Sequence, residues 1–418
     1  MNDNTPKSLS IVVIGDEILL GRVTDTNLGT ISRTLGAQGW ETRGVRTVGD
    51  RADDIRAAIE AAMEESDLVI TTGGLGPTRD DITKGVLMEI FGGSLVMDSA
   101  VTANIERVFA GRNIKLNELT RLQALVPDSC RVIQNTYGTA PVMWFERGGK
   151  VLVAMPGVPF ETRGMITGAA GRAIEEHFHP HARFRRAELT ATGISESALA
   201  ERLAAFEDSL PAGTHLAYLP SPGIIVLRLD SAGTAGPAFD ALMERLRQLV
   251  GDNLCGEGAM TPAAIAVATL RRKGLTLGAA ESCTGGRVAS AVTAVAGCSD
   301  VFMGSVVSYS NAAKMSILGV EKETLAEYGA VSEATVRQMA AGARCALGCD
   351  CAVATSGIAG PGGGSPGKPV GTVWIAAATP SATRTQLLHL PGDREAIAGA
   401  AAARALMLLI NMLNDNEI

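Results

Sequence analysis

Short apolar runs alternate with helical stretches along residues 9–170. The runs LSIVVI (9–14) and DLVITT (67–72) are apolar enough for buried strands, and the stretches at 17–38 and 51–66 are typical of helices. Strands and helices that alternate in this way predict βαβ units around a parallel sheet. The glycine-rich turns that follow the two strands are therefore expected at the ligand-binding edge of that sheet.

Two further units are predicted beyond this first one. Residues 184–250 combine strand and helix patterns over a short length, which is typical of a small α+β unit. The segment GDNLCGEGAMTP (251–262) lacks periodicity and has the Gly and Pro content of a boundary. After it, strand and helix patterns alternate again. The predicted domains are residues 1–172, 173–252 and 258–418.

Composition narrows the class of protein. The 418 residues exceed what one core usually supports, and 46% hydrophobic residues with 19% charged ones and 48 glycines favour an α/β enzyme. The net charge of -7 argues against broad nucleic-acid binding. Seven scattered cysteines and an N-terminus without a leader pattern predict a cytoplasmic protein. The apolar segment 396–413 is interrupted by Arg404, so we expect it to pack on its own domain rather than to span a membrane.

A glycine-rich turn with two acids follows the second apolar run. TTGGLGPTRDDIT (71–83) has backbone N–H groups that could face an anion, and Asp80 and Asp81 could hold a divalent metal that bridges phosphates. The structural alternative is that Asp80 caps the next helix while Asp81 complements its dipole. The turn lacks the lysine of a P-loop, which disfavours nucleoside triphosphate hydrolysis by that route.

The segment AAESCTGG places Ser282 and Cys283 between an apolar strand and a helix. Ser282 is either the N-cap of that helix or a nucleophile, and Cys283 is either a small buried thiol or a reactive one. Lys314 follows the next predicted strand, and a lysine whose pKa is lowered by burial can take the proton of a serine hydroxyl. A Cys-His pair would need His389, which lies in a predicted strand and is the only histidine of this unit. Ser282 is therefore the better nucleophile candidate.

Long motifs in the two outer units resemble those of one family. GDEILLGRVTDTN, TTGGLGPTRDDIT and MPGVPFE, and then AESCTGG, YSNAAK, TSGIAGPGG and PGDR, occur in the order seen in the CinA (competence/damage-inducible protein) family. The resemblance implies a three-layer α/β N-terminal domain of the molybdenum-cofactor-binding type, a small α+β middle domain of the KH type and an α/β C-terminal amidohydrolase domain. The middle segment has no clear GXXG clamp with flanking basic residues, so RNA binding is not implied.

For the N-terminal domain, the resemblance implies hydrolysis of ADP-ribose to AMP and ribose 5-phosphate with a divalent metal such as Mg, Mn or Co. Asp81 and Asp50 are the implied metal or base residues. Thr162 stands where the family usually has methionine, which concerns packing more than chemistry. Further positions expected near the ligand are Glu17, Asn27, Gly73, Gly74, Asp80, Thr83, Pro156 and Gly157.

For the C-terminal domain, the resemblance implies deamidation of nicotinamide mononucleotide (NMN) to nicotinic acid mononucleotide and ammonia, with no cofactor. The implied catalytic residues are Ser282, Tyr309 and Lys314. The N–H groups from Cys283 to Gly286 are expected to stabilise an oxyanion, and glycine amides or Arg394 to bind the phosphate. The expected substrate-binding positions are Cys283, Thr284, Gly285, Gly286, Ser299, Thr355, Ser356, Gly357 and Arg394.

Together these features predict a bifunctional hydrolase of pyridine-nucleotide salvage, since NMN and ADP-ribose are both fragments of NAD. The alternative is a molybdopterin-binding or regulatory protein whose N-terminal domain holds a ligand without turnover. A DNA-uptake accessory rests on the family's name alone, and the acidic charge weighs against it. The resemblance implies a homodimer, and no nucleic-acid or membrane partner is expected.

Overall fold

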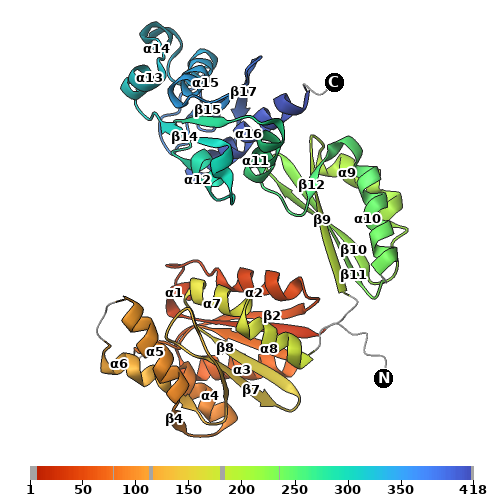
Figure 1. Cartoon of the computed structure of the whole chain (residues 1–418), viewed down its shortest axis with the longest axis vertical. Helices are drawn as coiled ribbons and strands as arrows, with labels where there is room; N and C mark the ends of the chain where they lie inside the picture. The colour runs from red at the N-terminus through yellow and green to blue at the C-terminus, as the bar shows by residue number, and fades with distance from the viewer. Residues whose placement is uncertain (1–6, 79, 113–115, 179–183, 235, 416–418) are drawn as a thin grey trace. The chain divides into compact units, whose positions relative to one another are not determined.

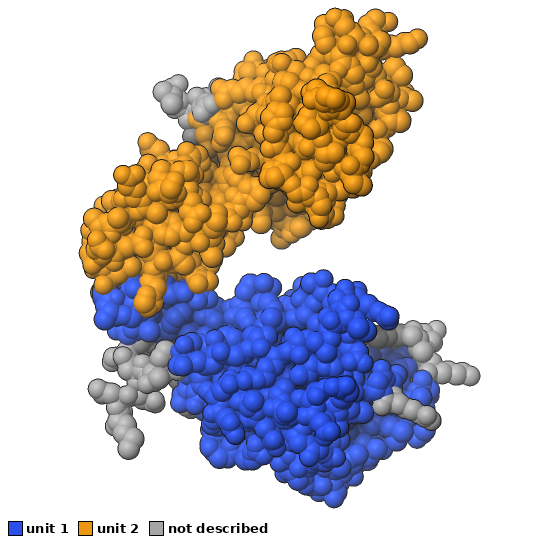
Figure 2. Space-filling view, turned by 180° about the vertical axis from the view of Figure 1, so that it is seen from behind, with its two compact units in different colours: residues 1–186, 211–214, 230–239 blue, residues 187–210, 215–229, 240–418 orange. Residues whose placement is uncertain are grey.

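The computed structural model of the chain describes residues 7–78, 80–112, 116–178, 184–234 and 236–415. Helices and strands mix throughout these residues, so the α/β class predicted from the sequence is confirmed (Figure 1). The chain forms two compact units, one of residues 1–186, 211–214 and 230–239 and one of residues 187–210, 215–229 and 240–418 (Figure 2). The three predicted domain limits stay predictions.

A six-stranded sheet is the centre of the N-terminal part. Its order is β2-β1-β3-β8-β7-β6, and β2, β1, β3 and β8 run parallel, as the alternating pattern predicts. The strands β7 and β6 add an antiparallel edge. The strands are β1 (Ser8–Ile14), β2 (Glu41–Val48), β3 (Leu68–Thr72), β6 (Arg131–Ile133), β7 (Val142–Arg147) and β8 (Lys150–Met155).

Helices cover both faces of this sheet because its strands are apolar on both sides. Ile11 and Val13 pack in a cluster with residues of α2 (Asn27–Gly36), α7 (Pro159–Ile166) and α8 (Ala169–Phe178). Val12 and Ile14 point to the other face and pack with α3 (Ala52–Glu65) and α4 (Thr83–Phe91). The result is a three-layer α/β arrangement. Smaller elements are α1 (Asp16–Leu19), β4 (Leu95–Met97), α5 (Ser99–Arg112), α6 (Glu118–Arg121), η1 (Leu122–Ala124) and β5 (Leu125–Pro127).

A four-stranded sheet with order β10-β11-β9-β12 follows. It differs from the prediction at one point, because residues 254–257 of the expected boundary form a strand that pairs antiparallel with β9. These residues are therefore held as a strand by their hydrogen bonds to β9, although their sequence has no strand pattern. The elements are β9 (Phe184–Thr192), α9 (Glu196–Glu207), β10 (Thr214–Ser221), β11 (Ile224–Ala232), α10 (Gly236–Val250), η2 (Gly251–Asn253) and β12 (Leu254–Glu257).

The C-terminal part is built on a five-stranded sheet with order β14-β13-β15-β16-β17. Here β14, β13 and β15 run parallel, and β16 and β17 run antiparallel to their neighbours. The strands are β13 (Leu277–Glu281), β14 (Phe302–Val307), β15 (Cys351–Gly357), β16 (Thr372–Ala378) and β17 (Thr383–His389), and the helices are α11 (Pro262–Lys273), α12 (Arg287–Thr293), η3 (Cys298–Asp300), α13 (Asn311–Leu318), α14 (Lys322–Tyr328), α15 (Glu333–Leu347) and α16 (Arg394–Asp415).

The long helix α16 is apolar because it packs in the hydrophobic core of the C-terminal part, against the sheet and two other helices. By length and composition its residues 394–414 could cross a membrane, but 61% of its apolar window is buried inside the protein. Ala401, Ala405 and Leu409 are fully buried in one cluster with residues of α11 and α12. This is the packing on its own domain that the sequence predicts.

Candidate active sites

A pocket of about 420 Å³ lies at the carboxyl ends of β1 and β3, the edge predicted for ligand binding. Gly73 follows β3 with φ +110°, and a Cβ atom there would lie 2.1 Å from the backbone oxygen of Ile14. Only glycine therefore lets the turn after β3 approach the end of β1 so closely. Of the expected ligand-binding residues, the lining contains Glu17, Asn27, Asp50, Gly73, Gly74, Asp80, Asp81 and Gly157.

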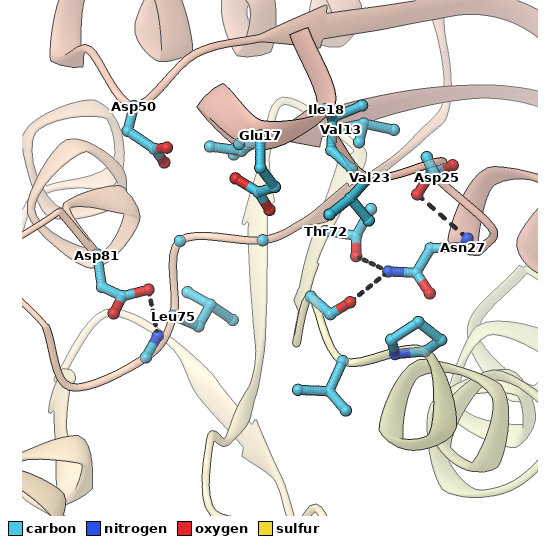
Figure 3. A pocket seen from close by; sticks show the side chains of 18 of the residues that line it. Val13, Glu17, Ile18, Val23, Asp25, Asn27, Asp50, Thr72, Leu75 and Asp81 are labelled. Carbon is cyan, nitrogen blue, oxygen red and sulfur yellow. Dashed lines mark hydrogen bonds between the residues drawn. The ribbon is translucent and has the colours of Figure 1, made fainter. Parts of the chain in front are cut away.

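Asn27 holds three segments of this pocket together (Figure 3). Its Nδ2 donates hydrogen bonds to Thr72 Oγ1 at 2.9 Å and to the backbone oxygen of Gly157 at 2.7 Å. Its backbone N–H donates to the carboxylate of Asp25, which also accepts the N–H of Leu28 and so starts α2. Asn27 Oδ1 is buried and has no hydrogen-bond partner among the described residues. The side chain therefore positions the lining as well as contributing to it.

Asp81 organises the glycine-rich turn. Its Oδ1 accepts the N–H of Gly76 at 2.7 Å (Figure 3), and its Oδ2 accepts the N–H of Thr78 at 2.9 Å and the Thr78 hydroxyl. The helix α4 begins only at Thr83, and its N-cap residue, Ile82, makes no side-chain cap hydrogen bond. The capping role considered for Asp80 is therefore wrong, whereas the dipole role considered for Asp81 stays a prediction.

Two of the expected residues, Thr83 and Pro156, lie behind the pocket surface. Thr83 is fully buried, and its Oγ1 donates to the backbone oxygen of Gly73 at 3.3 Å. The backbone oxygen of Pro156 accepts hydrogen bonds from the hydroxyls of Thr72 at 2.9 Å and Thr162 at 2.5 Å. Thr162, at the position where the resemblance leads us to expect methionine, thus helps to fix the loop before Gly157.

The pocket is strongly acidic. Glu17, Asp25, Asp50, Asp80 and Asp81 line it, and no described lining residue is a lysine, arginine or histidine. Burial raises the pKa of the Asp50 carboxyl, and repulsion from nearby acids raises it further. The hydrogen bond from the backbone N–H of Asp16 lowers this pKa but does not cancel the rise. An anionic ligand would be repelled here unless a cation entered with it.

The carboxylates of this pocket suit a hard divalent cation in chemistry, although they do not form a complete cage. Among the described residues, no three Asp, Glu, His or Cys side chains group closely enough to hold a metal ion by themselves. Asp50, Glu17 and Asp81 nevertheless lie around one space (Figure 3). Mg²⁺ is commonly held by one or two carboxylates together with substrate phosphates and water, and this donor set fits that mode.

A second pocket, of about 260 Å³, lies where β13 and β15 end in the C-terminal part. Of the expected residues, the lining contains Ser282, Cys283, Tyr309, Lys314, Ser356, Gly357 and Arg394. The remainder comes mainly from the glycine-rich loop after β15 and from Ala330 and Val331. This pocket contains two basic side chains and, among its described lining residues, no acid. Its charge is therefore opposite to that of the first pocket.

Ser282 and Lys314 meet in this pocket as the sequence predicts. Lys314 Nζ lies 3.1 Å from Ser282 Oγ, and it donates to the backbone oxygens of Ser308 at 2.7 Å and Tyr309 at 3.5 Å. The lysine side chain is 1% exposed, and burial lowers its pKa. A neutral amine that donates its two hydrogens to the two carbonyls turns its lone pair toward Ser282, which is the geometry of a general base.

Glu281, next to the candidate nucleophile, has a role that the sequence analysis missed. The side chain is fully buried at the end of β13. Its carboxylate accepts five hydrogen bonds of 2.8 to 3.0 Å, from the N–H groups of Gly286, Val288 and Ala289 and from the hydroxyls of Thr284 and Ser305. The N-cap residue of α12 is Gly286, without a side-chain cap bond, so the capping role considered for Ser282 is wrong. An acid that ends an otherwise apolar strand was the available signal.

The turn after Ser282 divides the expected oxyanion donors into two groups. The N–H of Gly285 donates to the backbone oxygen of Ser282, and the N–H of Gly286 to Glu281. In the described part of the chain, the N–H groups of Cys283 and Thr284 donate to no backbone oxygen. Of the four expected donors, these two are available to a substrate oxygen.

The side chains of Cys283 and Thr284 have structural surroundings. The Cys283 thiol is 7% exposed, and burial raises its pKa to about 11, which disfavours a thiolate at neutral pH. Thr284 Oγ1 is fully buried between the Glu281 carboxylate and Thr355 Oγ1, which lies 2.7 Å away. Thr284 and Thr355 therefore support the site from behind its surface.

Arg394 and Tyr309 form the outer part of the pocket. Arg394 donates to Tyr309 Oη at 2.6 Å and to the backbone oxygen of Gly360 at 2.7 Å. Ser356 Oγ donates to the backbone oxygen of Ala330 at 2.7 Å. These bonds connect the glycine-rich loop, the segment after β14 and the start of α16, so residues far apart in sequence line one space.

Ser299 is the one expected site residue that the structure places at the other end of the sheet. It is exposed in the short helix η3, which precedes β14. Ser282 follows β13, and the two strands run parallel, so the start of β14 and the end of β13 lie at opposite edges. Ser299 is absent from the described lining of this pocket.

The fold and the two pockets define a chain that joins two different α/β modules. Residues 10–174 match the family model described as "Probable molybdopterin binding domain", and residues 260–413 match the model described as "CinA C-terminal domain". These ranges contain the acidic and the basic pocket respectively.

The chain belongs to the CinA family. It is 42% identical to a "CinA-like protein" of Cytophaga hutchinsonii, with 94% of each chain covered. It is 40% identical to a "CinA-like protein" of Gemmatimonas aurantiaca, over 95% of this chain and 94% of that one. Among solved structures, the protein CinA "with unknown function" from Thermoplasma acidophilum is 36% identical and covers 40% of this chain and 98% of its own, with a TM-score of 0.37.

Proposed function

We propose that the C-terminal pocket deamidates NMN to nicotinic acid mononucleotide and ammonia. The observation that carries this proposal is the Ser282 hydroxyl 3.1 Å from the amine of a buried lysine. Ser282 Oγ attacks the carboxamide carbon while Lys314 takes its proton. Lys314 then returns the proton to the departing nitrogen, which leaves as ammonia. Water attacks the resulting ester, releases the carboxylate and restores the serine.

The surroundings of Ser282 suit the two charged groups of this reaction. The free N–H groups of Cys283 and Thr284 supply donors for the oxyanion of the tetrahedral intermediate. Arg394, on the outer side of the pocket, supplies a cation for the 5′-phosphate. The absence of acids among the described lining residues also favours a phosphorylated substrate over a neutral one.

Nicotinamide riboside tests this assignment because it differs from NMN only by the phosphate. We expect ammonia release from NMN, and a value of kcat/KM for the riboside that is lower by about 10- to 100-fold. Hydrogen bonds to charged groups contribute about 1.5 to 3 kcal/mol, and each 1.4 kcal/mol is a factor of about ten. Equal values for the two substrates would contradict the role given to Arg394. No ammonia from either substrate would contradict the deamidation.

For the N-terminal pocket, we propose metal-dependent hydrolysis of ADP-ribose to AMP and ribose 5-phosphate. Five lining acids with no described basic residue support a site that accepts a diphosphate only together with cations. When bound, a divalent cation such as Mg²⁺, Mn²⁺ or Co²⁺ neutralises the diphosphate and lowers the pKa of a bound water. Asp50 and Asp81 are the residues proposed to hold it. Glu17, Asn27 and the glycine turn bind and orient the nucleotide.

The second candidate function for this pocket is molybdopterin binding without turnover. Its support is the match of residues 10–174 to a molybdopterin-binding model, and the three hydrogen bonds that already occupy the Asp81 carboxylate. Full-length protein incubated with ADP-ribose and Mg²⁺ separates the two. AMP formation that EDTA abolishes supports hydrolysis. Binding of ADP-ribose without AMP formation supports the ligand-holding alternative.

We also propose that the protein acts in the cytoplasm as a homodimer, without a nucleic-acid or membrane partner. The net charge of -7 supports the absence of broad nucleic-acid binding. Light scattering tests the dimer. We expect twice the mass of one chain, which is 43.2 kDa.

A further inference from the structure

Glu281, the buried acid beside the candidate nucleophile, accepts more hydrogen bonds than the N-cap of a helix requires. A Ser, Thr, Asp or Asn at the N-cap position would satisfy the first N–H groups of α12 locally. Here that position is Gly286, and the acceptor comes from Glu281, the last residue of the preceding strand. All five partners of the carboxylate are neutral N–H or O–H donors. A carboxylate buried at this cost is retained only where many donors compensate it.

The carboxylate closes the turn that carries Ser282. Its bonds reach the N–H groups of Gly286, Val288 and Ala289, so the backbone from Glu281 to Ala289 forms a loop that is closed by its own first side chain. Ser282 is the second residue of that loop. Its own N–H continues the ladder to β15 by donating to the backbone oxygen of Thr355. The position of Ser282 Oγ is therefore set from both sides.

The same residue also fixes the segment that holds the candidate base. Its carboxylate accepts the hydroxyl of Ser305 in β14, and its backbone oxygen accepts the N–H of Ser308. The backbone oxygen of Ser308 in turn accepts the 2.7 Å hydrogen bond from Lys314 Nζ. Glu281 thus joins the turn that presents the hydroxyl to the strand end that anchors the amine.

We propose that Glu281 is a positioning residue that sets the distance between Ser282 Oγ and Lys314 Nζ. This inference rests on the proposed deamidation. Glu281 does not reach the substrate, since it is fully buried and is absent from the described lining of the pocket. Its carboxylate also occupies the N-terminus of α12, so the substrate phosphate binds elsewhere, toward Arg394 and the glycine-rich loop.

Glu281→Gln tests the inference, because the amide has the size of the carboxylate but turns an NH₂ group toward N–H and O–H donors. We expect kcat for NMN to fall by about 100-fold, as a misplacement of roughly 1 Å produces, while KM stays within about threefold. Asp350→Asn is the matched control. That carboxylate accepts the N–H and hydroxyl of Thr276 at the opposite edge of the same sheet. Its loss should destabilise the fold without lowering kcat.

NMN binding separates positioning from a general loss of structure. Calorimetry in the Ser282→Ala background, with and without Glu281→Gln, should give one site per chain and similar Kd values. A Glu281→Gln kcat equal to that of Asp350→Asn would overturn the inference. So would a loss of binding sites that matches the loss of activity. A wild-type protein that releases no ammonia overturns the deamidation and this role together, whereas an active wild type with an equally active variant overturns the role alone.

Discussion

Replacement of Lys314 by methionine removes the proposed base and keeps the unbranched side chain up to the position of the amine. Lys314 Nζ is the one described amine within hydrogen-bond distance of Ser282 Oγ, at 3.1 Å. A general base typically contributes about 10² to 10⁴-fold, so we expect kcat for NMN to fall by about 10³-fold. That loss corresponds to about 4 kcal/mol of transition-state stabilisation, at about 1.4 kcal/mol for each factor of ten.

The same substitution should leave the protein folded. The backbone oxygens of Ser308 and Tyr309 lose a donor, which costs about 1 to 3 kcal/mol for each buried group. Removal of an amine whose charged form is disfavoured by burial offsets part of this cost. Thermal unfolding should therefore still be cooperative, with a midpoint several degrees below that of the wild type.

Ammonia release from NMN, measured beside Lys84→Met, decides this prediction. Lys84 is the control because it is a half-buried lysine that also donates to two backbone oxygens, at 2.7 and 3.0 Å, and its desolvation lowers its pKa to about 8. It lies in the N-terminal part of the chain, and Lys84→Met should deamidate NMN at the wild-type rate. A folded Lys314→Met protein that keeps more than about a tenth of the wild-type kcat would refute the assignment of the base.

Three further outcomes are expected. First, the pKa of Lys314 is lowered by burial and the neutral amine is the base, so kcat/KM for NMN should rise with pH up to that lowered pKa and level off above it; a profile that falls over this range contradicts a lysine base. Second, EDTA should abolish ADP-ribose hydrolysis and leave NMN deamidation unchanged, which parallel assays of one sample would show. Third, Cys283→Ala should keep about half or more of the wild-type kcat, because the buried thiol has its pKa raised to about 11, and a dead variant would make the cysteine the nucleophile.

The sequence predicts most of the fold because its strands and helices differ clearly in apolar period. The parallel strands β1 and β3 and the turns after them are found where the alternation of runs places them. β12 escaped prediction because Leu254–Glu257 is a four-residue strand that contains Gly256. Its extended backbone is held by the pairing with β9. Short strands of this kind depend on tertiary context more than on local pattern.

The C-terminal site could be predicted where each of two interacting residues lies in a recognisable sequence motif. Ser282 and Lys314 are polar residues in fixed motifs, and their meeting requires only that β13 and β14 be parallel neighbours. Glu281 gave a weaker signal. An acid at the end of an apolar strand marks the position, but it has the same appearance in sequence whether it faces solvent or five donors. Ser299 was misplaced for the reverse reason, since a polar residue near a strand does not reveal which end of the sheet it joins.

In the proposed mechanism, Ser282 deamidates NMN with Lys314 as its base. Proton NMR of a reaction with the protein and NMN, combined with an ammonia assay, follows both products of this reaction. We predict one nicotinic acid mononucleotide for each ammonia released by the wild type, and no product above background with a folded Ser282→Ala variant. Product formation by that variant at a rate near that of the wild type would contradict the account.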